Sequence, residues 1–89
     1  MTTYLIGYDL NRPGQDYSEL FDAIKSYGYY WHYLDSTWII KSDRLAVEVR
    51  NHLQGHIDQN DKLFVGALTG VAAWTGINDK GTKWLKDNL

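Results

Sequence analysis

Three side chains with chemically useful groups lie in, or directly after, short apolar segments: Asp9, His32 and Ser36. Asp9 ends the apolar run 4–8, and its carboxylate is the kind of oxygen ligand that Mg²⁺ or Mn²⁺ takes in proteins. The imidazole of His32 could serve as a general base toward a phosphodiester or a ribose hydroxyl. Ser36 brings a hydroxyl beside Asp9 if their two strands pair. The three are therefore candidate catalytic residues, and Asp9 is also the candidate metal ligand.

A metal site built on Asp9 would draw on a second chain. A symmetric dimer could place two copies of Asp9 around one ion, because Mg²⁺ needs few carboxylates and keeps several waters. Such an ion lowers the pKa of a bound water for attack on a phosphodiester. The structural interpretation is simpler: Asp9 and Asn11 make turn hydrogen bonds ahead of Pro13, and His32 is a partly buried strand histidine. The sequence leaves both interpretations open.

Two further groups of residues invite a functional interpretation but favour a structural one. The first is a stripe four residues apart on a predicted helix, formed by Glu48, His52 and His56. It lacks a fixed fourth ligand and borders the apolar face of that helix, which indicates a core boundary rather than a metal site. The second is the aromatic cluster 29–38, which could stack nucleobases. No Lys or Arg interrupts residues 28–40, so packing in the core or in a dimer interface is the better explanation.

Composition limits the classes of protein that remain. The chain has 89 residues, 44% hydrophobic and 15% aromatic, which suits a single core. The absence of cysteine excludes disulfides and thiolate zinc sites. No apolar run approaches the roughly 18 residues of a membrane span, and the N-terminus lacks the pattern of a secretory signal, so we expect a cytoplasmic protein without a membrane partner. The net charge of −2 is a poor match for nucleic acid.

The hydrophobic pattern predicts four strands and two helices in the order βαββαβ. Apolar and aromatic runs predict strands at 3–8, 29–34, 37–41 and 62–68. This order is typical of the ferredoxin-like split βαβ sandwich, an α/β (α+β) fold. In that arrangement the first and third strands pair antiparallel at the centre of the sheet.

Capping signals give the expected helix boundaries. The first helix should open at Asp16, with Glu19 as its capping-box partner, and stop at Gly28. The second should begin after Ser42 as N-cap and close near Gly55. The residues expected to face the core from these two helices are Leu20, Phe21, Ile24, Leu45, Val49 and Leu53.

We expect one domain over residues 1–89, with a core at about 3–68 and a C-terminal extension at 69–89. The extension should end in a short helix from about Asp79. Both predicted helices cover the same face of the sheet, so something else must cover the other face. Either the extension, with Trp74 and Trp84, folds over that face, or a second subunit covers it. A homodimer is the expected assembly.

Three segments carry a resemblance to known proteins: 8–15 (YDLNRPGQ), 31–38 (WHYLDSTW) and 68–70 (LTG). Over roughly residues 3–68 the order of elements resembles the CRISPR adaptation small-nuclease fold and its relatives, the virulence-associated protein D (VapD) toxins. The longer motifs are similar to uncharacterised SinR-like small proteins of bacteria and phages. The likeness to those small proteins transfers a fold more readily than a function.

The resemblance also implies an activity and a site. In the nuclease relatives an Asp at the end of the first strand lies near the dimer axis and binds a divalent metal, and Asp9 matches that position. The relatives follow it with several basic residues, whereas this chain has Arg12 alone before Lys25. A small dimeric, metal-dependent endoribonuclease acting on RNA or DNA is therefore the first expectation. The acidic balance favours the alternative, a non-catalytic homodimeric binding or accessory protein of a phage or mobile element, with a protein or small-ligand partner.

Overall fold

A computed structural model describes residues 1–11 and 16–89 of the chain. Its elements, in chain order, are strand β1 (Thr2–Asp9), helix α1 (Ser18–Lys25), strands β2 (Tyr30–Leu34) and β3 (Thr37–Ser42), helix α2 (Ala46–Gln54), strand β4 (Lys62–Ala67) and helix α3 (Asp79–Asn88). The predicted order of four strands and two helices is confirmed, as is the short terminal helix from Asp79. Arg12, the basic residue that follows Asp9 in the sequence, lies outside the described residues, as does part of the turn predicted ahead of the first helix.

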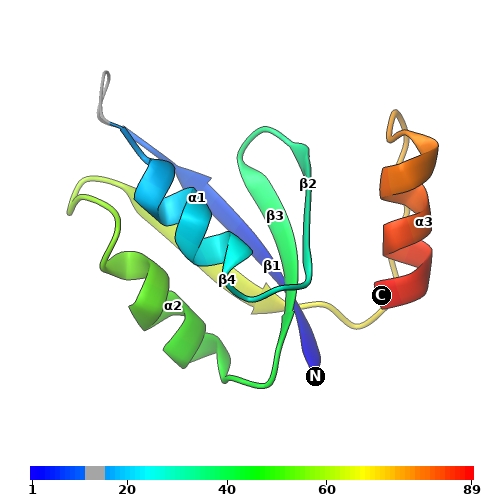
Figure 1. The fold of residues 1–89 in the computed structure, drawn as a ribbon, viewed down its shortest axis with the longest axis horizontal. Coiled ribbons are helices and arrows are strands. Elements are labelled where there is room, and N and C mark those ends of the chain that lie inside the picture. The colour runs from blue at the N-terminus through cyan, green and yellow to red at the C-terminus, as the bar shows by residue number, and fades with distance from the viewer. Residues whose placement is uncertain (12–15) are drawn as a thin grey trace.

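The strands form one antiparallel sheet in the order β2-β3-β1-β4, which makes this a small α+β domain (Figure 1). The predicted pairing of β1 with β3 at the centre of the sheet is confirmed, with Tyr4 opposite Ile40 and Ile6 opposite Trp38. Successive strand residues point to opposite faces, so the register divides the sheet into two chemically different surfaces.

Helices α1 and α2 cover the same face of the sheet (Figure 1). The main core lies between them and the strands, and Trp38 is the largest side chain that is fully buried there, with 1% of its surface exposed. Its other buried members are Tyr4, Ile6, Tyr8, Leu20, Ala23, Ile24, Ile40, Val49 and Leu53. Strands and helices therefore meet through the apolar alternation that the sequence pattern predicts.

The C-terminal extension covers part of the opposite face, so the first of the two expected arrangements holds for that part. Leu85 of α3 packs with Trp31 and Ile39 in a second buried cluster. The indole Nε1 of Trp31 donates a hydrogen bond to the carbonyl of Gly81 at 3.1 Å. A Cβ at Gly81 would lie only 3.1 Å from the ring of Tyr33 on β2, and 2.7 Å from the side chain of Ile77. Glycine is therefore what lets α3 approach the sheet this closely.

The predicted start of α1 at Asp16 is wrong, because the helix begins at Ser18 with Tyr17 as its N-cap. Asp16 instead accepts a hydrogen bond from the backbone N–H of Ser18 at 2.9 Å, a local Asx-type contact that competes with helical geometry. Glu19 is not a capping-box partner, and its carboxylate lies 3.8 Å from His56 of the second helix region. Gly28 does end this segment, with a φ of 87° that favours glycine.

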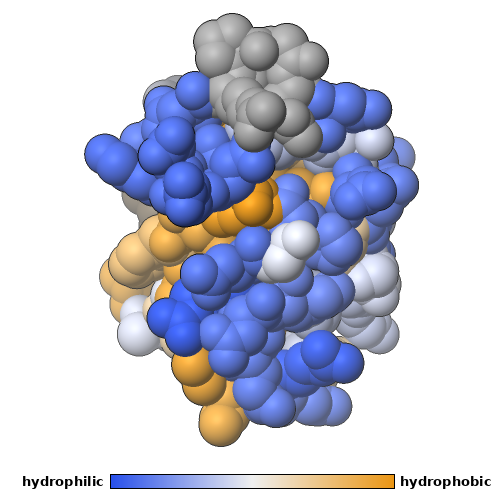
Figure 2. Space-filling view, turned by 90° about the vertical axis from the view of Figure 1, so that its left-hand side faces the viewer, coloured by the Kyte–Doolittle hydropathy of each residue, from blue (hydrophilic) through white to orange (hydrophobic). Residues whose placement is uncertain are grey.

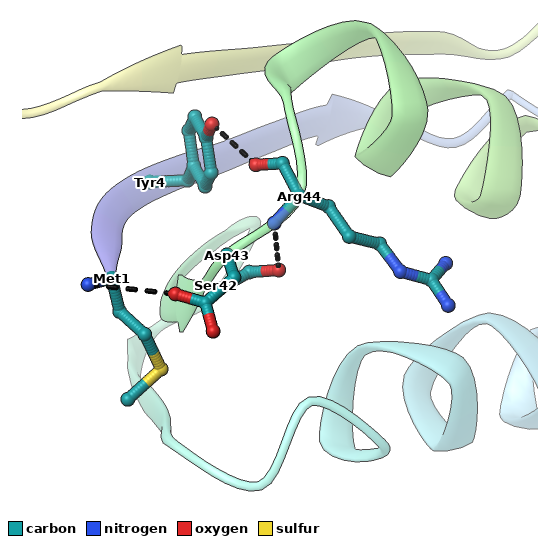
Figure 3. A network of polar contacts seen from close by, with 5 residues as sticks. All are labelled: Met1, Tyr4, Ser42, Asp43 and Arg44. Carbon is teal, nitrogen blue, oxygen red and sulfur yellow. Dashed lines mark hydrogen bonds and ion pairs between the residues drawn. The ribbon is translucent and has the colours of Figure 1, made fainter.

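The predicted N-cap of α2 at Ser42 is also wrong. Ser42 is the last residue of β3, and its Oγ accepts from the backbone N–H of Arg44 at 3.1 Å (Figure 3). The Tyr4 hydroxyl donates to the Arg44 carbonyl at 2.7 Å, and the N-terminal ammonium of Met1 lies 3.5 Å from Asp43. These contacts hold residues 42–44 outside the helix, which begins only at Ala46.

This shift changes which helical residues meet the core. Leu45 was expected to be buried but is 65% exposed, because it precedes the helix as its N-cap. Ala46 packs against the core in its place. Phe21 is half-buried rather than buried, with its ring 6.0 Å from that of Trp38. The other four expected helical core residues, Leu20, Ile24, Val49 and Leu53, are fully buried.

Candidate functional site

The second face of the sheet is covered over β2 and β3 by α3, and less so over β1 and β4. Phe64 of β4 lies on this face and is 63% exposed, and its strand partner across the register is Gly7 of β1. Leu5 lies on the same face of β1 and is half-buried. In Figure 2 hydrophobic surface gathers along the left-hand side of the view, the side that lies behind α1 and α2 in Figure 1.

A hollow of about 400 Å³ lies where β1 ends on this face, and it collects polar groups from three strands and one turn. Asp9 is directly opposite Lys62 of β4 in the strand register. Thr37 reaches the hollow from the start of β3, and Ser36 from the turn before it. The full lining is Gly7, Tyr8, Asp9, Ser36, Thr37, Lys62, Leu63 and Phe64. The structure thus brings Asp9, Ser36 and Thr37 together, as the paired strands required.

A chain of hydrogen bonds sets the position of Ser36 relative to Asp9. The backbone N–H of Tyr8 donates to the Ser36 carbonyl at 3.1 Å. The Tyr8 hydroxyl accepts from the buried Nε1 of Trp38 at 3.0 Å and donates to the Asp35 carbonyl at 3.5 Å. Burial raises the pKa of the Tyr8 phenol above its usual value, so the hydroxyl keeps its proton at neutral pH and remains a donor. Tyr8 is therefore a positioning residue for the turn that carries Ser36.

Replacing Tyr8 with Phe tests this hydrogen-bond chain. The substitution keeps the ring but leaves the buried Trp38 Nε1 without its acceptor, and an unsatisfied buried donor costs about 1–3 kcal/mol. We expect Tyr8→Phe to lower the free energy of unfolding by that amount, measured by urea denaturation. The matched control is Tyr29→Phe, since Tyr29 is 49% exposed and lies outside the core. Equal stabilities for both variants and the parent would contradict the role given to Tyr8.

The donor set of the hollow suits a divalent ion only in part. The carboxylate of Asp9 and the hydroxyls of Ser36 and Thr37 are oxygen ligands of the kind that Mg²⁺ accepts. In the part of the chain that the structure describes, no three or more His, Cys, Asp and Glu side chains gather where they could hold a metal. One chain therefore supplies a single carboxylate here, and Lys62 adds a positive charge that suits a phosphate oxygen.

His32 does not belong to this hollow. Its ring stacks on Trp38 with centroids 3.7 Å apart and planes 10° from parallel, on the face of the sheet that α1 and α2 cover. Its side chain is exposed, and its Nε2 lies 3.3 Å from the Asp35 carbonyl. The structure thus places His32 outside the hollow that Asp9 and Ser36 line, and in a second hollow with Trp38.

The stripe of Glu48, His52 and His56 is occupied with structural contacts. The Glu48 carboxylate accepts from the backbone N–H of Leu45 at 2.9 Å, which caps α2. The Tyr27 hydroxyl shares a hydrogen bond with Nδ1 of His52 at 2.8 Å. His52 and His56 meet edge to face, with ring centroids 5.8 Å apart. These contacts join α2 to the turn that follows α1 at the border of the core, as the structural interpretation expects.

The contact of His52 with Tyr27 predicts a pH dependence of stability. Burial, then the nearby His56 and Arg44, lower the pKa of His52 below its usual value of 6.5. The unfolded chain then binds the proton more readily. The stabilisation from neutral His52 is therefore present above about pH 6.5 and is lost as the pH falls from there through the lower pKa of the folded chain. We expect His52→Gln to flatten the change in free energy of unfolding between about pH 7 and pH 5. Urea denaturation at several pH values measures it, and an unchanged pH profile would contradict the assignment to His52.

Sequence reasoning missed Lys62 as a member of the site. Lys62 stands 53 positions after Asp9, and only the register of β1 with β4 brings the two opposite each other. The signal that could have found it is the predicted edge strand 62–68, because the ferredoxin-like order pairs that strand with the first one.

The chain matches no protein-family model, and no solved structure matches its fold. None of the described helices has the length and apolar character needed to cross a membrane.

Proposed function

We propose that this protein is a small homodimeric enzyme of nucleic acids, a metal-dependent endoribonuclease of the CRISPR/VapD type, in which Asp9 of each chain holds the metal. The observation that carries the proposal is the hollow where Asp9, Ser36, Thr37 and Lys62 meet. An exposed carboxylate, two hydroxyls and an ammonium group on one surface match what a metal ion and a phosphodiester need from a protein. His32 lies outside this group.

The fold supports this assignment indirectly. The element order and the strand order β2-β3-β1-β4 are those expected of the ferredoxin-like arrangement, and we take the domain to be a member of that class. The resemblance of this chain to the nuclease relatives rests on the same order of elements, and those relatives have an Asp at the end of the first strand. Asp9 is the last residue of β1.

A homodimer completes the proposed site. Each chain contributes one carboxylate at the hollow, and two copies of Asp9 around a symmetry axis would give an ion two charged ligands. When bound, Mg²⁺ or Mn²⁺ supplies a water of lowered pKa and neutralises charge on the phosphate. Lys62 would bind a phosphate oxygen, and Ser36 and Thr37 would orient the bound water or the ribose by hydrogen bonds. Exposed Phe64 and half-buried Leu5 provide apolar surface next to the axis.

The second candidate function is a non-catalytic, cytoplasmic, homodimeric binding or accessory protein of a phage or mobile element. The net charge of −2 favours it, because proteins that hold nucleic acid gain affinity from excess positive charge. The same hollow would then receive a protein side chain or a small ligand. The two candidates share the dimer and differ in whether a phosphodiester is cut.

Incubation of the purified protein with single-stranded RNA and with double-stranded DNA distinguishes the two candidates. We expect cleavage with Mg²⁺ or Mn²⁺ and none with excess chelator. Low salt is used because binding to phosphates is stronger there. Sedimentation of the same sample should show a dimer. A dimer that cuts neither substrate with either metal would replace the first candidate with the second, and a monomer would contradict both.

A further inference from the structure

A second hollow, of about 430 Å³, lies on the helix-covered side of the sheet, between α1 and β2. It is lined by Phe21, Lys25, Tyr30, His32 and Trp38. Four of these side chains are aromatic rings, one is a cation, and none of the described lining residues is acidic. No residue of this hollow lines the one that contains Asp9, so the two surfaces are separate.

The rings of the hollow gather around Trp38, and the His32 ring stacks on it. Trp38 is at its base, 1% exposed, with the Phe21 ring at 6.0 Å and the Tyr30 ring at 5.9 Å from its own. The His32 ring lies parallel to the Trp38 ring at 3.7 Å and is exposed to solvent. One face of the His32 ring is therefore covered by Trp38, and the other is free to receive a further flat ring.

The pairing of β2 with β3 places His32 in this position. Trp31 of β2 lies opposite Ile39 of β3, so the next residue of β2, His32, comes level with Trp38, on the face of the sheet that α1 covers. The register shifts by one residue between Trp31 and Leu34. The exposed ring of His32 lies over Trp38, in the same hollow as Lys25 of α1.

We propose that this hollow binds a nucleoside monophosphate unit, either as a free nucleotide or within a single strand. The base stacks on the exposed face of His32, as bases do on aromatic side chains of single-strand binders. The phosphate pairs with the ammonium group of Lys25, which has no acidic competitor in the lining of the hollow. The volume is within the range of sites for small molecules. This site does not depend on Asp9 or on catalysis.

Nuclear magnetic resonance of the indole N–H groups tests the site, because the chain has four Trp residues in different places. Titration with adenosine 5′-monophosphate should shift the Trp38 indole and the backbone amide of His32, and leave the indoles of Trp74 and Trp84 unchanged. His32→Ala should weaken binding about fivefold or more, the loss typical of removing one stacking ring. His32→Phe should restore the affinity, since the stack is restored.

Lys25 has its own test. Lys25→Gln should weaken binding of adenosine 5′-monophosphate but not of adenosine. The matched control Lys86→Gln, at an exposed position of α3, should change neither. A short oligoadenylate that binds more tightly than the mononucleotide would assign the site to single strands, and equal affinity would assign it to free nucleotides. The proposal is overturned if Trp38 does not shift at any nucleotide concentration up to about 10 mM, or if His32→Ala binds as well as the parent. Shifts confined to Gly7 and Phe64 would also overturn it, because they would place the nucleotide in the Asp9 hollow.

Discussion

Trp38→Ala should lower the free energy of unfolding by about 3–5 kcal/mol, the usual loss on truncating a fully buried aromatic ring. Trp38 is 1% exposed, and the rings of Phe21, Tyr30 and His32 pack around it. The substitution also removes the Nε1 donor that binds the Tyr8 hydroxyl. A small domain has about 5–15 kcal/mol in total, so this single change should remove a large share of its stability.

Trp74→Ala is the matched control, because it makes the same substitution at an exposed position of the extension. Trp74 is 37% exposed and belongs to neither buried cluster, although its Nε1 donates to Thr82. We expect a loss below about 1 kcal/mol for this variant. Urea denaturation of both proteins gives the comparison. Losses of similar size at the two positions would mean that Trp38 is not the centre of the core.

Asp9→Asn should lower the rate of metal-dependent cleavage by about 100-fold or more, because a bound metal supplies several kcal/mol of transition-state stabilisation. Asparagine keeps the size of the side chain but lacks the charge that attracts Mg²⁺ or Mn²⁺. Asp9 is exposed at the end of β1, so the melting temperature should change little. Rates of RNA cleavage and thermal denaturation of the same preparations measure the two effects.

The control for Asp9 is Asp43→Asn, which makes the same change of charge at the start of the segment before α2. Asp43 is exposed, and its ion pair with the N-terminus should contribute little. We expect full activity from this variant. Cleavage that survives Asp9→Asn would show that Asp9 is not the metal ligand, and loss of activity in both variants would indicate a general effect of charge.

Much of the fold follows from apolar alternation that can be read along the chain. Tyr4, Ile6 and Tyr8 repeat every second residue, and their burial beneath the two helices follows from that period. Val49 and Leu53 repeat every fourth residue and are buried for the equivalent helical reason. These signals depend only on neighbours in sequence, which is why they can be read without a structure.

Helix starts were harder to predict, because they depend on contacts between distant residues. Ser42 has the residue type of an N-cap, but its Oγ accepts from the backbone N–H of Arg44, and the Tyr4 hydroxyl holds the Arg44 carbonyl outside the helix. The helix begins later than predicted, and Leu45 is exposed as a result. No local pattern in residues 42–45 reports the position of a side chain on β1.

The candidate sites show the same division. The approach of Asp9 to Ser36 follows from the expected pairing of the first and third strands, and the structure places both in one hollow. The greater distance of His32 from Asp9 is expected from the same strand order, because His32 alternates with Trp31, which packs against α3. The approach of His32 to Lys25 depends on where α1 lies over the sheet. Helix placement arises from tertiary packing, and spacing in the sequence does not report it.

Paramagnetic broadening by Mn²⁺ tests the central claim, a metal held by Asp9 at the end of β1, most directly. Substoichiometric Mn²⁺ added to the parent protein should broaden the backbone amides of Gly7, Thr37 and Phe64, which line the hollow, and should leave those of α3 sharp. Saturation should require one ion for every two chains, and Asp9→Asn should show no selective broadening. Broadening that centres on the His52 and His56 contact instead, or that spreads evenly over the surface, would contradict the account.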